Sequence, residues 1–281
     1  MGDDYGTYTK QIIKYANANG IIIPSSDIID AMETFIGQLV ANDLWNRFDI
    51  FYNFAYNNVN LKDFARINWK SPGDFTITYN GTVDYGVDGY KGTYDSSYAG
   101  LKLNTGFVPS THAVQYQPSN SSAFLYGNIA LPYKGIPDGD GYGRDGAFIF
   151  SDGVQCIGSM YEFLNPQFNF FSTNSNNISQ IPSNTFNSPQ TPHFFLIDRL
   201  YTNHHEFYRD TNDLFGQVTS TYNSSLSSNQ VKLLGSYKPE SGLYDDSNFM
   251  SLFGLGCSFL DDTHNGNFYS FLNTFRAAIG L

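Results

Sequence analysis

The residues best suited to chemistry in this 281-residue chain are three carboxylates in a glycine-rich run. Asp138, Asp140 and Asp145 lie in the segment 138–146, and carboxylate oxygens on a flexible backbone are ligands that Ca²⁺ prefers. The run departs from an EF-hand loop, because Ile149 stands where the bidentate Glu is required. We predict a candidate calcium site at the three aspartates, with an acidic turn that holds no ion as the alternative. No other cofactor is expected.

A second candidate site consists of tyrosines in the expected loops. The chain has 21 Tyr and 25 Phe, and most of the Phe side chains must fill the core. A tyrosine ring can stack on a sugar or a partner surface while its hydroxyl stays in water. The four candidate ligand or partner contacts are Tyr133, Tyr142, Tyr237 and Tyr244, and the alternative for each is an ordinary loop tyrosine.

The sequence lacks the local patterns that are typical of hydrolases. None of its four glutamates has an Asp or Glu two residues away, so the paired-carboxylate strand of sandwich glucanases is missing. The run from Gly256 to Leu260 lacks the second glycine of a nucleophile elbow. On a strand, His204 and His205 would point to opposite faces and could not share a metal. We therefore expect no enzyme, although a pair of aspartates from distant segments stays an open alternative.

Charge and hydropathy limit the partners of the chain. Its net charge of −11 and pI near 4.6 disfavour nucleic acid, whose binding depends on Lys and Arg. No stretch reaches the roughly 18 apolar residues of a membrane span, and the first residues do not resemble a signal peptide. Cys156 and Cys257 show no metal spacing, so we expect buried thiols, with a disulfide as the alternative.

The composition predicts a mainly β protein with one principal core. Hydrophobic residues make up 41% of the chain and charged residues only 15%, and the polarity comes from residues of strands and turns. Turn residues at Tyr79 to Gly81 predict a hairpin, and the Asn- and Pro-rich segment from Ser172 to Pro192 predicts an exposed excursion. The short runs predicted as strands of a sandwich or barrel are 75–79, 123–126, 147–150, 154–159, 194–197, 206–208 and 231–234.

Helices are expected at both ends of the chain. Apolar residues recur at helical spacing over 28–40, after short polar side chains at 25–27 that can cap the first turn. A helix is also expected over 8–18, ending at Asn19 and Gly20, and another over 268–279. The dense aromatic run over 44–56 is expected to enter the first core strand. We therefore divide the chain into a helical segment 1–55 and a β-sandwich 56–281.

Several stretches resemble a family of phage-particle proteins with a concanavalin-like (laminin G-like) sandwich. They are "ANANGIIIPSSDIIDAMETFIGQL", "LWNRFDIFYNFAYNN", "ARINWKSPGDFTITYNGTVDYGVDGYKG", "LNTGFVPST" and "GLGCSFLDDTHNGNFYSFLNTFRAAIG". The residues that match the family pattern are Trp45, Asp49, Tyr52, Phe54, Ala55, Asn68, Gly106, Phe107, Pro109, Ser110, Thr111 and Gly280.

The resemblance implies an antiparallel jelly-roll sandwich with N-terminal helices and a short C-terminal helix. It implies a virion structural protein, as a capsid decoration, head fibre or tail component, that is assembled in the host cytoplasm. Other virion proteins and further copies of the chain, in a homo-oligomer, would then be its partners. The alternative function is a carbohydrate- or receptor-binding protein that recognises a host surface glycan, and both functions can hold for one chain.

Overall fold

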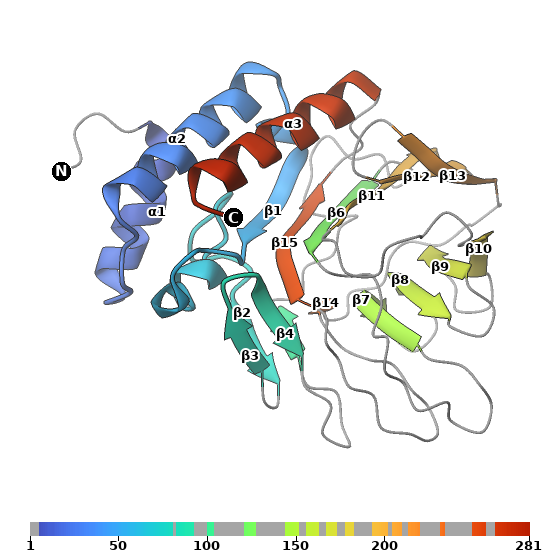
Figure 1. Ribbon diagram of the computed structural model, residues 1–281, viewed down its shortest axis with the longest axis horizontal. Helices are drawn as coiled ribbons and strands as arrows, with labels where there is room; N and C mark the ends of the chain where they lie inside the picture. The colour runs from blue at the N-terminus through green and yellow to red at the C-terminus, as the bar shows by residue number, and fades with distance from the viewer. Residues whose placement is uncertain are drawn as a thin grey trace.

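The computed structural model describes residues 6–80, 83–92, 100–103, 121–127, 144–151, 156–162, 167–172, 178–182, 193–201, 204–209, 213–219, 231–233, 249–256 and 262–281. Within these, side chains are described for 6–48, 50–79, 83–90, 251–254 and 263–281. These parts comprise three α-helices, short 3-10 helices and the strands of two antiparallel sheets (Figure 1).

Two helices begin the chain, as their apolar spacing predicts. Helix α1 is Thr7–Ala18 and helix α2 is Ser26–Ala41. The chain leaves α1 through Gly20, whose φ of 65° suits glycine. The predicted capping of α2 is wrong in one respect, because Ser25 is its N-cap but makes no side-chain cap hydrogen bond. The buried face of α2 consists of Ile28, Ile29, Met32, Phe35, Ile36 and Leu39.

The C-terminal helix α3, Asp262–Ala278, confirms the helix expected near the end of the chain. It begins six residues before the predicted start, and its buried residues include Phe268, Leu272 and Phe275. Figure 1 shows α3 beside α2, so the two ends of the chain form one helical layer over the sheets.

Strand β1, Phe48–Asn53, joins the first part of the chain to the sheet that contains β15, Phe249–Gly256. Its other edge is covered locally. The Trp69 amide donates to the Phe51 carbonyl at 2.8 Å, and the Phe51 amide donates to Asn68 Oδ1 at 3.1 Å. These bonds satisfy backbone groups that an uncovered edge strand would leave unpaired. The expected strand within the aromatic run 44–56 is confirmed.

The strands form two fully antiparallel sheets. The eight-stranded sheet has the order β13-β12-β11-β6-β15-β4-β3, with β1 also paired to β15, and the seven-stranded sheet has the order β10-β9-β8-β7-β14-β5-β2. The remaining strands are β2 Ile77–Asn80, β3 Val83–Gly86, β4 Gly89–Gly92, β5 Gly100–Leu103, β6 Ser121–Gly127, β7 Arg144–Ser151, β8 Cys156–Glu162, β9 Gln167–Ser172, β10 Ile178–Pro182, β11 His193–Tyr201, β12 His204–Arg209, β13 Asp213–Thr219 and β14 Val231–Leu233.

Each of the seven predicted strands overlaps an observed one, but two local predictions are wrong. The expected hairpin at 79–81 does not form, because β2 pairs with β5 in one sheet while β3 pairs with β4 in the other. The segment from Ser172 to Pro192 is not entirely an excursion, since β10 lies within it and pairs with β9. Turn residues mark where a strand ends, but long-range pairing decides its neighbour.

Aromatic side chains fill the core between the helical layer and the eight-stranded sheet, which contains β1. Phe35 of α2 makes ring contacts with Phe51, Trp69, Phe268 and Phe275, with centroids 5.1 to 6.5 Å apart. These residues come from α2, β1, the segment after β1 and α3. Packing of large rings from distant segments therefore fixes how the two ends of the chain meet.

Candidate functional site

Most of the residues predicted to meet an ion or a partner lie outside the described parts of the chain. This holds for the candidate calcium ligands Asp138 and Asp140. Asp145 lies in β7, opposite Tyr161 of β8 in the backbone register, and its side chain is not among those described. The four candidate contact tyrosines lie outside the described residues too; they are Tyr133, Tyr142, Tyr237 and Tyr244. No group of three potential metal ligands occurs among the residues that the structure does describe.

The described residues that carry the family resemblance mainly build the core. Trp45, Tyr52, Phe54 and Ala55 are completely buried. The side chain of Asn68 is buried too, and it accepts hydrogen bonds from two backbone amides. These five side chains thus belong to the core and are not part of an exposed binding surface.

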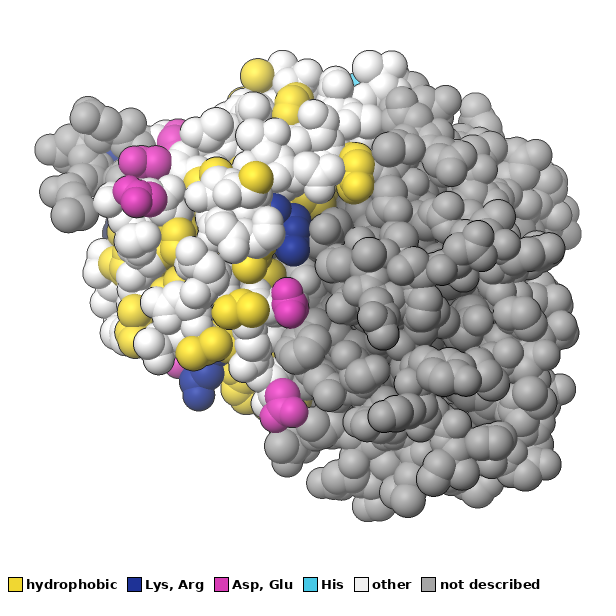
Figure 2. All heavy atoms as spheres, viewed as in Figure 1, with side chains coloured by type: hydrophobic (Ala, Val, Ile, Leu, Met, Phe, Trp, Pro, Cys, Tyr) yellow, Lys and Arg dark blue, Asp and Glu magenta, His cyan; other side chains and the backbone are white. Residues whose placement is uncertain are grey.

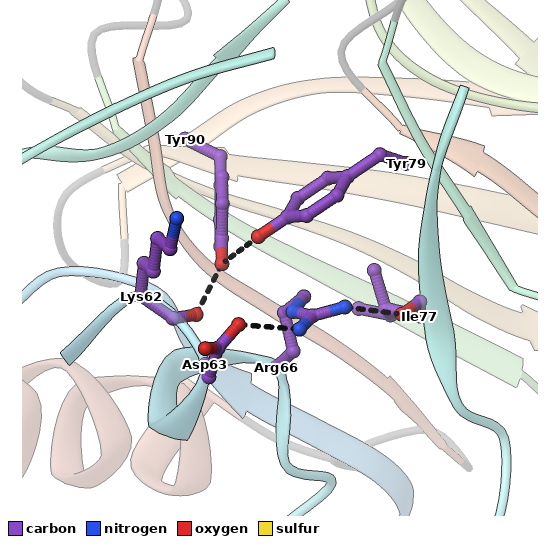
Figure 3. A network of polar contacts seen from close by, with 6 residues as sticks. All are labelled: Lys62, Asp63, Arg66, Ile77, Tyr79 and Tyr90. Carbon is purple, nitrogen blue, oxygen red and sulfur yellow. Dashed lines mark hydrogen bonds and ion pairs between the residues drawn. The ribbon is translucent and has the colours of Figure 1, made fainter. Parts of the chain in front are cut away.

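The structure instead brings together a polar and aromatic group that the sequence reasoning missed. We call it the Tyr79 cluster, and it consists of Asp63, Arg66, Tyr79, Tyr85 and Tyr90 (Figure 3, which draws four of the five). Arg66 ends the 3-10 helix Phe64–Arg66, Tyr79 lies on β2, and the last two tyrosines face each other across the β3–β4 pair. The cluster therefore spans the edges of both sheets.

Arg66 is the charged centre of the Tyr79 cluster. Its guanidinium lies 4.6 Å from the centre of the Tyr79 ring, a cation–π arrangement. One terminal nitrogen pairs with Asp63 Oδ1 at 2.5 Å, and the other donates to the Ile77 carbonyl at 3.4 Å (Figure 3). Burial lowers the pKa of Arg66, but Tyr79, Asp63 and Tyr90 together raise it above the ordinary value. The guanidinium therefore stays protonated.

The hydroxyl of Tyr90 links the cluster to the backbone at Lys62. Its side chain is completely buried, and its hydroxyl donates to the Lys62 carbonyl and lies 3.1 Å from the Tyr79 hydroxyl. Burial, followed by the hydrogen bond with Tyr79, raises the pKa of Tyr90 above the ordinary value. This hydroxyl is held as a neutral donor and acceptor, which fixes the orientation of the Tyr79 ring.

Tyr85 adds an unsatisfied polar group beside Tyr90. Its ring centroid lies 4.7 Å from that of Tyr90, and burial raises the pKa of its hydroxyl. The hydroxyl oxygen is buried and has no hydrogen-bond partner among the described residues. An unpaired buried hydroxyl costs about 1–3 kcal/mol, so a partner for this oxygen would stabilise the protein.

Part of the Tyr79 cluster reaches solvent. The Tyr79 residue is 40% exposed, and the side chains of Asp63 and Arg66 are 47% and 27% exposed. An exposed ring beside a carboxylate and a guanidinium can stack on a flat ligand face and form directed hydrogen bonds. The cluster therefore offers an aromatic face, a carboxylate and a guanidinium to a ligand.

The signal for this cluster was present in the sequence, at Tyr79, Tyr85 and Tyr90 within 12 residues. Of these three tyrosines only Tyr79 was considered, as part of a predicted hairpin turn. Figure 2 shows that charged side chains are sparse on the described face, where hydrophobic atoms are scattered among polar ones. The ion pairs of the described residues include Arg66–Asp63 and Arg47–Asp43.

The structure is similar to solved two-sheet binding domains, and this likeness shows the fold. The receptor-binding domain of botulinum neurotoxin D matches with a TM-score of 0.55 and 10% identity, over 80% of this chain and 53% of that chain. The serotype D ligand-binding domain in complex with N-acetylneuraminic acid matches with a TM-score of 0.53 and 10% identity, over 82% and 52%. The chain thus spans about half the length of these solved chains.

A Trypanosoma rangeli sialidase in complex with a difluoro nononic acid also matches, with a TM-score of 0.54 and 10% identity, over 88% of this chain and 40% of that chain. The chain therefore has a β-sandwich fold with helices at its termini, as the sequence predicted. No protein-family model and no curated protein matches the sequence. Among the described helices, none is long and apolar enough to cross a membrane.

Proposed function

We propose that this chain is a non-catalytic surface protein whose β-sandwich binds a glycan on a receptor. The observation that carries the proposal is the Tyr79 cluster, in which an exposed aromatic ring lies beside an exposed carboxylate and a guanidinium. The likeness to receptor-binding domains supports it at the level of fold. Fold alone does not give function, so the proposal depends on the side chains of the site.

The chemistry of the Tyr79 cluster matches that of a sugar. One face of a sugar ring carries C–H groups that pack on an aromatic ring, and its hydroxyls need donors and acceptors at the rim. Tyr79 offers the ring, and Asp63 offers an acceptor. The ring is already oriented by the hydrogen bond with Tyr90, so little conformational freedom is lost on binding.

We also propose that the sandwich has the concanavalin-like jelly-roll topology that the sequence resemblance implies. Two fully antiparallel sheets, with the last strand β15 between β6 and β4, support this assignment. Such a sandwich presents connecting loops at its ends, and ligand contact by the four loop tyrosines named from the sequence stays a prediction.

Binding of purified protein to an array of defined glycans tests the proposed function. We expect one structural class of glycan to bind in a concentration-dependent and competable manner. Protein that is folded by circular dichroism and binds no glycan and no host-cell surface would contradict the proposal. Release of sugars from a bound polysaccharide would contradict its non-catalytic part.

A second candidate function is a structural protein of a phage virion, as decoration, head fibre or tail component. The stretches that resemble phage-particle proteins favour it, and so does the layer of α2 and α3, which can serve as a base for assembly. Other virion proteins and copies of the chain would be its partners, and the virion its location. Purified and washed particles should contain the chain at a fixed copy number, and its absence from them would exclude this function.

Calcium binding at Asp138, Asp140 and Asp145 stays a prediction. If these residues hold Ca²⁺, calcium should raise the melting temperature and a chelator should lower it, because a ligand that binds only the folded state stabilises it. The triple Asn variant should lose this response. An unchanged melting temperature over a calcium titration would favour the acidic turn.

A further inference from the structure

We propose that the Tyr79 cluster binds an uncharged sugar in preference to an acidic one. This inference rests on the proposed glycan-binding function and adds the chemical class of the ligand. It depends on whether Arg66, the charged centre of the cluster, is free to pair with a carboxylate.

Each terminal nitrogen of Arg66 already makes one hydrogen bond. Its two terminal nitrogens bind Asp63 Oδ1 at 2.5 Å and the Ile77 carbonyl at 3.4 Å. Its Nε is buried and has no hydrogen-bond partner among the described residues, so it does not face solvent. A ligand carboxylate would have to share the terminal nitrogens with Asp63 and the Ile77 carbonyl, which weakens the paired bonds by which Arg recognises carboxylates.

The charges around Arg66 also leave no excess positive charge that would attract an anion. Asp63 balances its charge, and the exposed Asp84 and Asp88 lie on the β3–β4 hairpin that carries Tyr85 and Tyr90. The whole chain carries a net charge of −11. Lys62, next to Asp63, and Lys91, opposite Asp84 in the strand register, offset the two hairpin carboxylates, so a ligand carboxylate would meet a region without excess positive charge.

The groups that remain available suit neutral hydroxyls. Asp63 uses Oδ1 for Arg66, and its Oδ2 accepts no hydrogen bond from the described residues. Because the side chain is 47% exposed, a ligand can reach this carboxylate. A sugar hydroxyl can donate to this oxygen and form a charge-assisted hydrogen bond. The exposed part of the Tyr79 ring supplies the stacking surface.

The test compares neutral glycans with their sialylated counterparts on the same core, by array and then by calorimetry. Wild-type protein should prefer the neutral member of each pair. Tyr79→Ala should weaken binding at least about tenfold, which equals about 1.4 kcal/mol. Tyr79→Phe keeps the ring and loses only the hydroxyl that orients it, so its loss should be smaller. Tyr269→Ala, at a partly buried tyrosine on α3, is the matched control and should bind like wild type.

The outcomes separate this inference from the proposed function. Glycan binding that survives Tyr79→Ala unchanged, in protein with an unaltered melting temperature, would overturn the assigned site and leave glycan binding intact. Preference for the sialylated member of each pair would overturn the neutral class. Absence of binding to every glycan would overturn the proposed function and this inference with it.

Discussion

Phe35 of α2 stacks on Phe275 of α3, with ring centroids 5.1 Å apart and an interplanar angle of 22°. The two residues are 240 positions apart in the sequence, and both are buried. This contact joins α2 to α3, and Phe35 also contacts Phe51 of β1, with ring centroids 5.9 Å apart. The helical layer therefore depends on the last helix as much as on the first two.

Phe275→Ala should lower the free energy of unfolding by about 3–5 kcal/mol, the usual cost of removing a buried Phe ring. The ring is lost from two contacts, with Phe35 and with Trp69, whose ring centroid lies 5.7 Å from that of Phe275. Denaturant unfolding measures the change. The control is Asn273→Ala on the exposed side of the same helix, and an equal loss in both variants would show that the stack is not the cause.

Asn68→Ala should destabilise the protein by about 2 kcal/mol, because it leaves two backbone amides without a partner. The side-chain oxygen accepts from the amides of Phe51 and Lys70, both at 3.1 Å. Hydrogen exchange at the Phe51 amide should speed up. Asn58→Ala removes a similar but exposed side-chain acceptor for the Asn60 amide and should cost much less. Equal losses would show that burial of the bonds does not matter.

Asp63→Asn should change the ligand preference of the Tyr79 cluster, because it removes the charge that balances Arg66. We expect binding of sialylated glycans to rise and binding of neutral glycans to fall. Glycan arrays on both proteins measure the change. Asp84→Asn removes a charge from the nearby hairpin without freeing Arg66 and should have a smaller effect. An unchanged preference in Asp63→Asn would contradict the view that this ion pair sets the ligand class.

The protein should lose stability as the pH rises above about 10, where tyrosines of the unfolded chain ionise. Burial is the main cause that raises the pKa of Tyr52, Tyr56, Tyr85 and Tyr90 in the folded state. The unfolded chain therefore releases these protons first, and the free energy of unfolding falls by up to about 1.4 kcal/mol per pH unit for each group. Below pH 10 these groups contribute no pH dependence.

Spectroscopic titration of tyrosinate, together with unfolding measured at several pH values, checks this prediction. Tyr52, Tyr56, Tyr85 and Tyr90, the four identified among the described residues, should ionise only as the protein unfolds. Tyr90→Phe should make the fall in stability with pH less steep, because it removes one of the four groups. If every tyrosine of the folded protein ionised near pH 10, the prediction would be wrong.

Much of the fold could be predicted from the chain because local patterns determined it. Apolar spacing located α2, and Asn19 and Gly20 ended α1 as expected. The predicted strands overlap observed ones because runs of β-branched and aromatic residues between turn residues favour extended backbone. The hairpin at Tyr79 was predicted wrongly, because partners far along the chain decide which strands pair.

The sequence by itself determined the helices at both ends and a β-sheet middle, because backbone propensity and apolar periodicity act over a few residues. Only the tertiary structure decided that Arg66, Tyr79 and Tyr90 meet, since two of them lie on strands of different sheets. The same holds for the joining of Phe35 to Phe275. Such contacts depend on how sheets and helices pack, and packing is a property of the whole folded chain.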